Sequence, residues 1–485
     1  MKVAVIGSGI GGLASAIRLA AKGHKVEVFE AYAKPGGKLS EIKNKEYRFD
    51  AGPSLFTLPT LVDELFELAG ENPREHFNYE KLPIVCNYFY PDGTEFSAYA
   101  DQEKFIDELS SKLGEKESSL RKALSKSKEL YDTLADLFVF SSLQDIRTFL
   151  SKKAFSAYAK MPFLGFTKTM SRANEQLFKN SKTVQFFNRF ATYNGSDPYK
   201  TPATMNIIPH LEMGIGAFFP KGGMYSIPHS LYELATRQGV IFHFNSPIDL
   251  ILLKDRQAIG VRSNNIDHHF DRIVSNVDVV NTYKHLLPSI RPPKLIVNQP
   301  KSSSALIFYW GVKKQFEKLD LHNIFFSQDY KLEFDHIFNR GSIFEDPTIY
   351  VNISSKNNAS DAPNYGENWF TMINVPNNQG QDWDLLIAQA RSNMITKLSA
   401  ILKVDMEALI ETEDILEPRS IESRTGSSLG ALYGNSSNNL FAAFLRHANV
   451  SKRVKNLYFC GGSVHPGGGI PLSLSSAKIM AKYFR

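Results

Sequence analysis

Two short apolar runs flank a helical pattern at the start of this chain. The first run, Val3 to Ile6, is rich in β-branched residues and ends directly in a glycine-rich turn, which predicts a buried parallel strand. Helical periodicity then extends from about Ile10 to Lys22, and Gly23 ends it. The second run, Val26 to Phe29, predicts another strand. The opening residues therefore predict a β-α-β unit of a parallel sheet.

Strict alternation of apolar and polar residues marks other parts of the chain. Tyr79 to Tyr99 alternates around the turn Pro91-Asp92-Gly93, which predicts a β-hairpin. Another hairpin is predicted over Leu39 to Phe49, before a helix from about Pro59 to Ala69. Further strands are predicted at Ser304–Val312, Ile349–Ile353 and Asn368–Val375, with a helix at Trp383–Ile401. The segments at 79–99 and 304–375 predict an antiparallel sheet that is distinct from the parallel unit.

Helical periodicity dominates between Asp101 and about Arg189, where turn residues are few, and this predicts a long helical insertion. Within it, Ala154 to Met170 combines aromatic residues and leucine with lysines. That composition suits a helix at a membrane surface with snorkelling lysines, and it equally suits a helix packed on the protein's own core. The aromatic stretch from Phe186 to Phe219 is interpreted as core or as one wall of an apolar ligand channel.

A β/α pattern resumes in the second half of the chain and returns at its end. The last segment predicts a strand at Asn456 to Cys460, a glycine-rich loop, and a helix from Leu472 to Phe484. We expect these elements to join the first parallel unit. The middle elements predicted for the same unit are a helix at Ser226–Gln238, a strand at Val240–Phe244, a hairpin over Leu250–Arg262 and a strand at Phe270–Val274.

The composition describes a globular protein of more than one domain. With 485 residues, of which 43% are hydrophobic and 22% charged, the chain is too long for one ordinary core. No apolar run approaches the ~18–20 residues that span a bilayer, and we expect no signal peptide. Cys86 and Cys460 lie far apart, which favours a reducing compartment over a disulfide framework. The sequence contains neither CxxC nor HExxH, so we expect no metal site.

The excess of lysine and arginine over aspartate and glutamate has two interpretations. A formal net charge of +6 fits a mildly basic solvated surface, and it also fits attraction to anionic lipid. Nucleic-acid binding is not expected, because the lysines and arginines are spread along the chain without a long basic run.

The turn after the first strand has the spacing of a dinucleotide-binding motif. Gly7 permits the tight turn, Gly9 lets a diphosphate approach the backbone, and Gly12 lets the helix pack closely on the strand. Glu30 ends the second strand, where a carboxylate can bind a ribose hydroxyl. The N-terminus of the helix supplies partial positive charge for the diphosphate. A chance glycine-rich turn would not have both strands, the helix and the acid at these positions.

Two further loops are candidates for contact with the same cofactor. Gly36 and Gly37 follow a proline and precede Lys38, so the loop can present backbone N–H groups and a cation. Gly52-Pro53-Ser54 is a small-residue loop before a helix and suits contact with a flat ligand. Plain surface turns and an ordinary helix cap are the alternatives.

The glycine-rich loop near the C-terminus changes the identity of the expected cofactor. Gly461-Gly462-Ser463 and Gly467 to Pro471 lie between a strand and a helix, where close approach of a flat or anionic group is possible. A flavin needs such a second site for its ring, and the N-terminus of the last helix would favour the reduced ring. We find no second GxGxxG in strand and helix context, so the electrons are expected to pass to an acceptor such as quinone or oxygen.

The sequence resembles the phytoene desaturase family of FAD-dependent carotenoid oxidoreductases, and most closely the branch that desaturates hydroxylated carotenoids at C3–C4. The resemblance covers nearly the whole chain. It is carried by VAVIGSGIGGLASAIRLAAKGHKVEVFE, PGGK, FDAGPS, ATYNGSDPYKTPATMNIIPHLE, FFPKGGMYSIPHSLYELA, NSPI, DAPNYGENWF and NLYFCGGSVHPGGGIPLSLSSAK. One departure is Lys38, where the family often has arginine, and lysine lacks the planar fork for a bidentate contact.

The resemblance implies an α/β fold with three parts. These are a Rossmann-like FAD-binding domain of the amine oxidase/glutathione reductase type, an antiparallel-sheet substrate domain and a helical, membrane-associated insertion. The expected ranges are 1–75, 216–285 and 417–485 for the FAD-binding domain, 76–100 and 286–416 for the substrate domain, and 101–215 for the insertion. The expected FAD contacts are Gly7, Ser8, Gly9, Ile10, Gly11, Gly12, Glu30, Ala31, Gly36, Gly37, Lys38, Gly52, Pro53, Ser54, Pro247, Ile248, Gly461, Gly462, Ser463, Gly469, Ile470 and Pro471.

The implied activity is desaturation of a long apolar carotenoid that is acyclic or monocyclic and hydroxylated. The expected chemistry is hydride transfer to flavin N5 with loss of a proton from the adjacent carbon, in a cytoplasmic protein bound peripherally to a membrane lipid surface. His465 is the nearest titratable residue in a cofactor loop and a candidate base, although packing of the loop is the simpler role. The alternatives are a phytoene- or neurosporene-type desaturase, a redox-neutral carotenoid isomerase, a non-catalytic carotenoid-binding protein and an amine oxidase-like enzyme.

Overall fold

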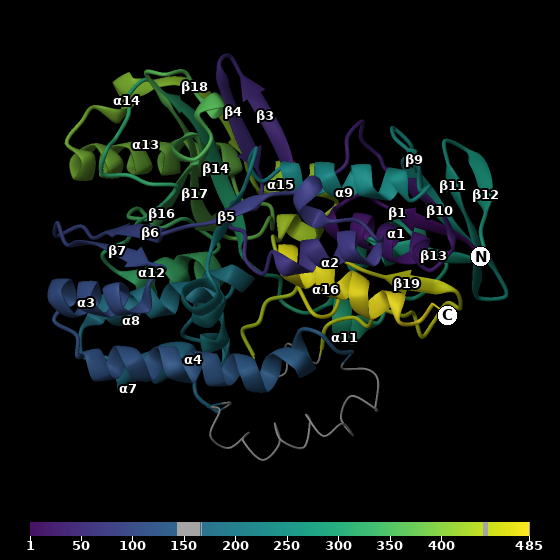
Figure 1. The fold of residues 1–485 in the computed structure, drawn as a ribbon, viewed down its shortest axis with the longest axis horizontal. Coiled ribbons are helices and arrows are strands. Elements are labelled where there is room, and N and C mark those ends of the chain that lie inside the picture. Colours follow the sequence, from purple (N-terminus) through teal and green to yellow (C-terminus); the bar gives the residue numbers. More distant parts are fainter. Residues whose placement is uncertain (143–164, 166, 440–444, 485) are drawn as a thin grey trace.

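A five-stranded parallel sheet forms the nucleotide-binding part of the molecule. The computed structural model describes residues 1–142, 165, 167–439 and 445–484. In this sheet the N-terminal strand occupies the centre, and the C-terminal strand occupies one edge (Figure 1). The order of the strands is β19 (Leu457–Phe459), β13 (Arg272–Ser275), β1 (Lys2–Ile6), β2 (Lys25–Phe29) and β9 (Ile241–His243). Strands that lie far apart in the sequence therefore end at one common edge.

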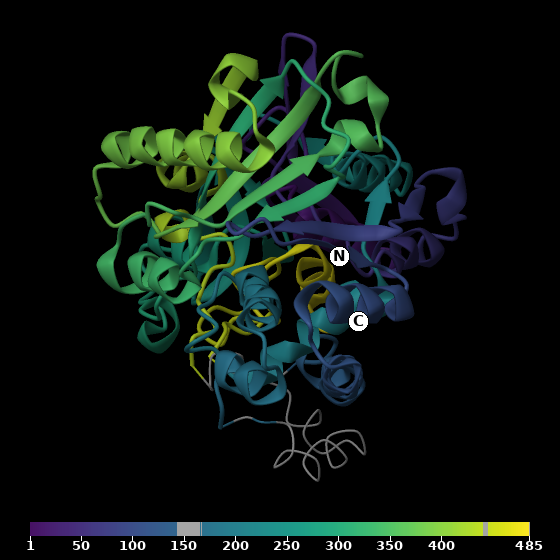
Figure 2. The ribbon, with the colours of Figure 1, turned by 90° about the vertical axis from the view of Figure 1, so that its left-hand side faces the viewer.

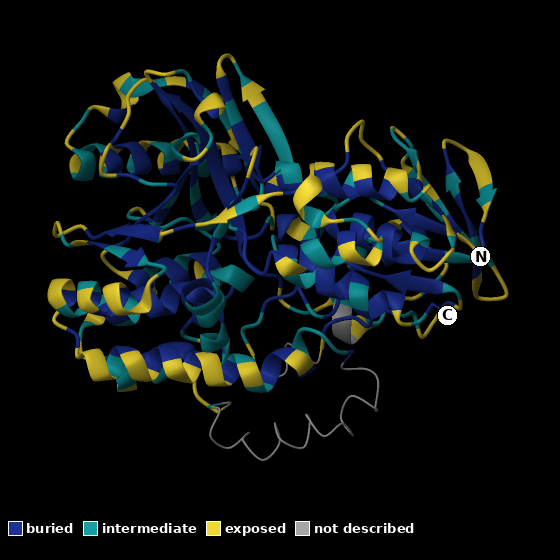
Figure 3. Cartoon of the chain, viewed as in Figure 1, coloured by how far each residue is buried: buried dark blue, intermediate teal, exposed yellow. Residues whose placement is uncertain are grey.

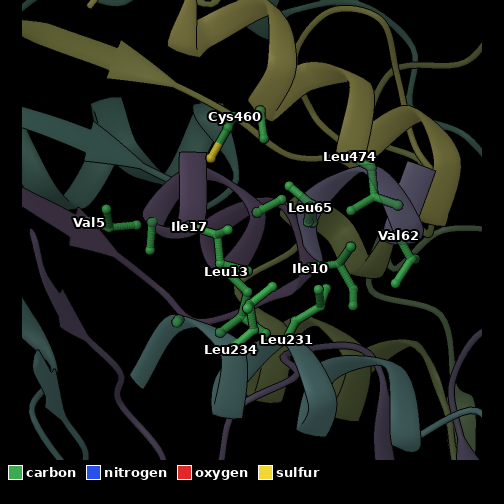
Figure 4. Packing of buried hydrophobic residues seen from close by; sticks show 14 of the residues in the cluster. Val5, Ile10, Leu13, Ile17, Val62, Leu65, Leu231, Leu234, Cys460 and Leu474 are labelled. Atoms are coloured by element: carbon green, nitrogen blue, oxygen red, sulfur yellow. The ribbon is translucent and has the colours of Figure 1, made fainter. Parts of the chain in front are cut away.

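Four helices pack around this sheet, and α1 lies at their centre. The side chains of Leu13 and Ile17 on α1 are fully buried, and they meet Leu474 from the last helix and Leu231 (Figure 4). The apolar period of residues 10–20 explains this burial, because every third or fourth residue returns to the same face. The helices are α1 (Ile10–Ala20), α2 (Thr60–Leu68), α9 (Ser226–Arg237) and α16 (Ile470–Ala481).

A seven-stranded sheet forms the second part of the molecule. All of its pairings are antiparallel except that of β15 with β6, which is parallel. The sequence predicts the antiparallel pattern but gives no sign of this one exception. The order is β18 (Ile410–Leu416), β14 (Ser304–Val312), β17 (Glu367–Val375), β16 (Ile349–Ile353), β15 (His322–Phe325), β6 (Ile84–Phe89) and β7 (Glu95–Tyr99).

Helices cover both faces of the seven-stranded sheet (Figure 2). Phe89 packs in the cluster that contains α13 (Trp383–Leu402), whereas Tyr88 and Tyr90 pack in the cluster that contains α3 (Gln102–Leu113) and α8 (Ser181–Asn188). This division follows from the alternation of side chains along β6. The insertion contributes α3 (Gln102–Leu113), α4 (Glu117–Phe138), α7 (Met170–Leu177) and α8 (Ser181–Asn188), and the outer faces of α3 and α4 are exposed (Figure 3).

Three small sheets and several short helices complete the fold in the described residues. Tyr79 does not belong to the hairpin predicted for 79–99, because Pro83 interrupts the strand and residues 79–81 pair with β8 (Phe218–Pro220) instead. The smaller sheets are β10 (Ile248–Lys254), β11 (Gln257–Ser263) and β12 (Ile266–His269); β3 (Ser40–Asn44) and β4 (Tyr47–Ala51); and β5 (Tyr79–Lys81) and β8 (Phe218–Pro220). The short helices are α10 (Val279–Asn281), α11 (Lys294–Val297), α12 (Tyr330–Asp335), α14 (Met406–Leu409) and α15 (Pro418–Thr425).

Candidate functional site: a cavity between the two large sheets

A cavity of about 890 Å³ brings together segments from the start, the middle and the end of the chain. It is lined by the loop after β1, the end of β2, the loops around residues 36 and 52, and the N-terminus of α16. The predicted cofactor residues that line it are Gly7, Gly9, Ile10, Gly11, Glu30, Ala31, Gly36, Gly37, Lys38, Gly52, Pro53, Ser54, Pro247, Ile248, Gly461, Gly462, Ser463, Gly469, Ile470 and Pro471.

Ser8 and Gly12 are the two expected contact residues that do not line this cavity. Ser8 is fully buried and donates hydrogen bonds from its backbone N–H and its hydroxyl to one carboxylate oxygen of Glu30, at 2.8 and 2.6 Å. A Cβ at position 12 would lie 2.0 Å from the carbonyl oxygen of Gly7. We therefore assign Ser8 to orienting Glu30, and Gly12 to the close packing of α1 on the first turn.

Glu30 is held in a fixed orientation at the end of β2. One of its oxygens accepts the two bonds from Ser8, and the other accepts the backbone N–H of Tyr32 at 3.0 Å. The side chain is 6% exposed and lines the cavity. A carboxylate fixed in this way keeps free lone pairs, so it can accept a hydrogen bond from a ribose hydroxyl.

Asn276 lies among the glycines, and the sequence analysis missed it. A Cβ at Gly9 would lie 2.8 Å from its Oδ1, and a Cβ at Gly11 or Gly461 would lie 2.7 or 2.4 Å from its Nδ2. The amide also donates to the carbonyl of Cys460 at 3.3 Å. Asn276 thus fills the space between the first glycine loop and the last one. Its position one residue after a parallel strand was the signal that could have identified it.

The N-terminus of α16 offers unsatisfied backbone donors to the cavity. Gly469 precedes the helix with φ +100°, and no side chain caps the first turn. Gly469, Ile470 and Pro471 all line the cavity. Because the first N–H groups of a helix have no partner within it, this end can stabilise negative charge on a ligand.

Lys38 lines the cavity and keeps accessible surface in the cofactor-free structure. Its ammonium group donates to the carbonyl of Leu432 at 2.9 Å. Burial lowers the pKa of Lys38 to about 8, and the charge of Asp278 partly opposes this change. Lys38 thus places at the cavity wall an ammonium group that loses its proton more readily than that of an ordinary lysine.

We predict that the stability of the cofactor-free protein depends on the charge of Lys38. The folded-state pKa of about 8 lies below the ~10.4 of a lysine in an unfolded chain, so unfolding takes up a proton between these values. The free energy of unfolding of the wild type should therefore rise relative to Lys38→Met as the pH increases from 8 to 10.5. Urea unfolding at pH 7, 8, 9 and 10 measures this, with the exposed Lys25→Met as control. Parallel pH curves for the wild type and Lys38→Met would exclude the effect.

His465 does not line the cavity, which corrects its candidacy as a base. Its side chain is 1% exposed, and its Nε2 donates to the backbone carbonyl of Ser141 at 2.7 Å. Burial lowers the pKa of His465 to about 4. The residue therefore joins the C-terminal loop to the end of the helical insertion and is not placed to take a proton from a ligand in the cavity.

Only part of the aromatic stretch from Phe186 to Phe219 lines the apolar wall of the cavity. Phe186, Phe187 and Phe190 are at most 2% exposed and belong to a hydrophobic core, not to the cavity lining. The same segment supplies other apolar residues to the wall, and β14 and β17 supply the rest. These lining residues include Met205, Ile207, Ile208, Leu211, Ala305, Ile307, Phe370 and Met372. These three phenylalanines thus support the wall from behind, whereas Tyr193 of the same segment lines the cavity.

The predicted membrane-surface segment falls almost entirely outside the described residues. Of Ala154 to Met170, the structure describes 165 and 167–170. Among the described residues, no helix is long and apolar enough to cross a membrane. Both cysteines are buried and free, and no group of three or more metal-ligating side chains occurs in the described parts of the chain.

The residues present fit FAD. A diphosphate needs close access to backbone, and side-chain-free positions at Gly9 and Gly11 provide it beside Glu30. The flavin ring needs a second site, and the loop at 461–471 shares the same cavity. Contacts of the individual residues with FAD remain predictions.

Comparison with known proteins points to the same cofactor class. Residues 10–333 match the family described as flavin containing amine oxidoreductase. The chain is 50% identical to a 1-hydroxycarotenoid 3,4-desaturase from a Flavobacterium species, with 99% of this chain and 98% of the relative covered. It is 28% identical, over 99% and 98% of the two chains, to a 4,4'-diapophytoene desaturase from Staphylococcus haemolyticus. Cyclohexylamine oxidase from Brevibacterium oxydans has the same fold, with a TM-score of 0.63, 14% identity and coverage of 99% and 98%.

Proposed function

The chain belongs to the family of flavin-containing amine oxidoreductases, and we propose that it is an FAD-dependent desaturase that introduces a C=C bond into a long, hydroxylated carotenoid. The observation that carries this proposal is the shared cavity described above. It joins the glycine-rich loops expected to hold FAD to a wall of aliphatic and aromatic side chains. The 50% identity to a 1-hydroxycarotenoid 3,4-desaturase over nearly the full length supports the same substrate class.

The chain's own residues bind the substrate by excluding water. A carotenoid has few polar groups, so its affinity must come from apolar area, at about 25 cal/mol per Å² buried. Met205, Ile208 and Leu211 provide such area on one side of the cavity, and Ile307 and Phe370 provide it on the sheet side. Bound FAD supplies the acceptor for a hydride from the substrate. The N-terminus of α16 and the Lys38 cation can stabilise the negative charge that this transfer brings into the cavity.

The test is expression in a host that makes acyclic carotenoids with and without hydroxyl groups, followed by mass spectrometry of the pigments. A desaturase yields products that have lost two hydrogens per new double bond. Anaerobic incubation of the purified holoprotein with the substrate in liposomes should bleach the flavin absorbance. Products of unchanged mass with an altered isomer pattern would instead identify an isomerase, and an unreactive bound pigment would identify a carotenoid-binding protein.

We further propose that the enzyme works at a membrane surface in the cytoplasm and passes its electrons to quinone or oxygen. The motivation is the substrate, which dissolves in lipid, together with the mildly basic net charge of +6. Sedimentation with anionic and with neutral liposomes tests the first part, since a charge-assisted attachment should be stronger on the anionic ones. Reoxidation of the bleached flavin by added quinone, compared with oxygen, tests the second.

A further inference from the structure

One polar cluster interrupts the apolar wall of the cavity. Arg189 and Tyr193 lie on the 3-10 helix Arg189–Asn194, and Glu212 lies on the π-helix His210–Ile215. All three side chains line the cavity, and the sequence analysis did not single them out. Apolar residues such as Met205 and Ile208 share the same wall.

The three side chains form one charge-compensated unit. The guanidinium of Arg189 donates to one carboxylate oxygen of Glu212, and it donates to the hydroxyl of Tyr193 at 3.2 Å. The hydroxyl of Tyr193 in turn donates to the other carboxylate oxygen of Glu212. Arg189 is 5% exposed and Glu212 is 1% exposed, so both charges are withdrawn from water. The cluster as a whole carries no net charge.

Arg189 is fixed in position and keeps an unused donor. Its guanidinium lies 4.2 Å from the ring centre of Phe190 and 5.1 Å from that of Tyr88. Its Nε is buried and has no hydrogen-bond partner among the described residues. A buried donor without a partner destabilises the folded protein, so such groups call for an explanation.

Stability alone does not account for this cluster. Replacing a buried ion pair by apolar residues of similar size is often neutral or stabilising. A neutral unit with both donors and acceptors instead complements a ligand that is itself neutral and has one hydroxyl group. Such a hydroxyl can accept from the Arg189 guanidinium and donate to the Glu212 carboxylate, whereas a charged ligand would upset the balance of the pair.

We propose that Arg189, Tyr193 and Glu212 bind the hydroxyl group of the carotenoid and so select hydroxylated substrates. This inference rests on the proposed function. In a 1-hydroxy substrate desaturated at C3–C4, the carbon that carries the hydroxyl is two bonds from the first reacting carbon. Binding the hydroxyl therefore also determines which C–H bonds lie beside the cofactor.

His322 lines the same cavity as the polar cluster and is joined by hydrogen bonds to the loop expected to hold the cofactor. Burial, with a further contribution from the charge of Arg189, lowers the pKa of His322 to about 3. Its Nδ1 is 2.7 Å from the hydroxyl of Tyr350, which is 2.8 Å from the hydroxyl of Ser54. Ser54 belongs to the loop Gly52-Pro53-Ser54. The polar cluster and the loop expected to hold the cofactor thus line one cavity, and the Arg189 charge acts on a histidine that is hydrogen-bonded toward that loop.

The test compares the binding and turnover of two substrates by four proteins. The substrates are an acyclic carotenoid with a hydroxyl at carbon 1 and its counterpart without the hydroxyl, both in detergent. The proteins are the wild type, Tyr193→Phe, Glu212→Gln and the control Tyr90→Phe. Tyr90 is buried in the same hydrophobic core and donates to the carbonyl of Lys182 at 2.8 Å, but it does not line the cavity.

We expect the first two variants to lose about tenfold to a hundredfold in kcat/KM and in affinity for the hydroxylated substrate, the size expected for a hydrogen bond to a charged group. Their values for the counterpart should stay near those of the wild type, and Tyr90→Phe should keep the wild-type discrimination. Equal losses on both substrates, or unchanged discrimination, would overturn the inference. A wild type that binds FAD and prefers the hydroxylated pigment without desaturating it would instead refute the proposed function alone. A wild type with no preference refutes the inference, whether or not it is active.

Discussion

The Gly9→Val protein is expected to fold without binding flavin, so that the purified protein lacks yellow absorbance. Gly9 has φ −65°, which any residue can adopt, so a side chain here causes no backbone strain. The obstacle is space, because a Cβ on Gly9 would lie 2.8 Å from Oδ1 of Asn276 and 4.0 Å from the carbonyl oxygen of Gly36. Overpacking of this kind costs about 1–3 kcal/mol, and it displaces the backbone that a diphosphate must reach. We expect the affinity for FAD to fall by about a hundredfold or more.

The measurement is the ratio of flavin to protein after purification and after reconstitution with FAD. Circular dichroism and thermal unfolding of the cofactor-free forms separate loss of binding from loss of the fold. Ala21→Val is the matched control, since Ala21 is exposed at the far end of the same helix. Stoichiometric FAD in Gly9→Val would mean that the diphosphate does not bind at this turn.

Sequence periodicity predicts the elements of this fold well where one face of each is buried. The helix at 10–20 and the strands at 304–312 and 367–375 lie within two residues of their predicted bounds. Periodicity is a property of local segments, however, and it does not specify partners. The parallel pairing of β15 with β6 joins residues more than two hundred positions apart, and the sequence carries no local signal for it.

The candidate site shows the same limit at the level of single residues. Glycines at fixed spacing are visible in the sequence because they reflect a backbone requirement, and twenty of the expected contact residues line the cavity. Asn276 and Arg189 are not visible, because their importance comes from what the fold places beside them. For Ser8 and His465, a position in a predicted cofactor loop does not determine where the side chain points. Their side chains are hydrogen-bonded to Glu30 and to the carbonyl of Ser141, and neither residue lines the cavity.

The largest loss of stability is expected from Asp50→Ala, because its buried carboxylate joins β4 to the turn before α9. Asp50 is 4% exposed and accepts the backbone N–H groups of Met224 at 2.7 Å and Tyr225 at 3.0 Å. It also accepts the guanidinium of Arg48 at 2.8 Å. Removing the carboxylate leaves two backbone donors and part of a buried cation without an acceptor. Breaking a buried pair in this way costs about 3–5 kcal/mol of unfolding free energy.

Removing the Asp50 carboxylate should also weaken flavin binding, because Asp50 lies directly before the loop at 52–54. It also orients Tyr225, whose hydroxyl donates to the carbonyl of Pro35 just before the glycines at 36 and 37. Urea unfolding of the cofactor-free protein measures the stability, and titration with FAD measures the binding. Asp50→Asn keeps one acceptor oxygen and should lie between the wild type and Asp50→Ala. The control is Asp267→Ala, which removes an exposed partner of Arg262 and should change stability far less. If Asp50→Ala and Asp267→Ala were equally stable, Asp50 could not be the anchor between β4 and the turn before α9.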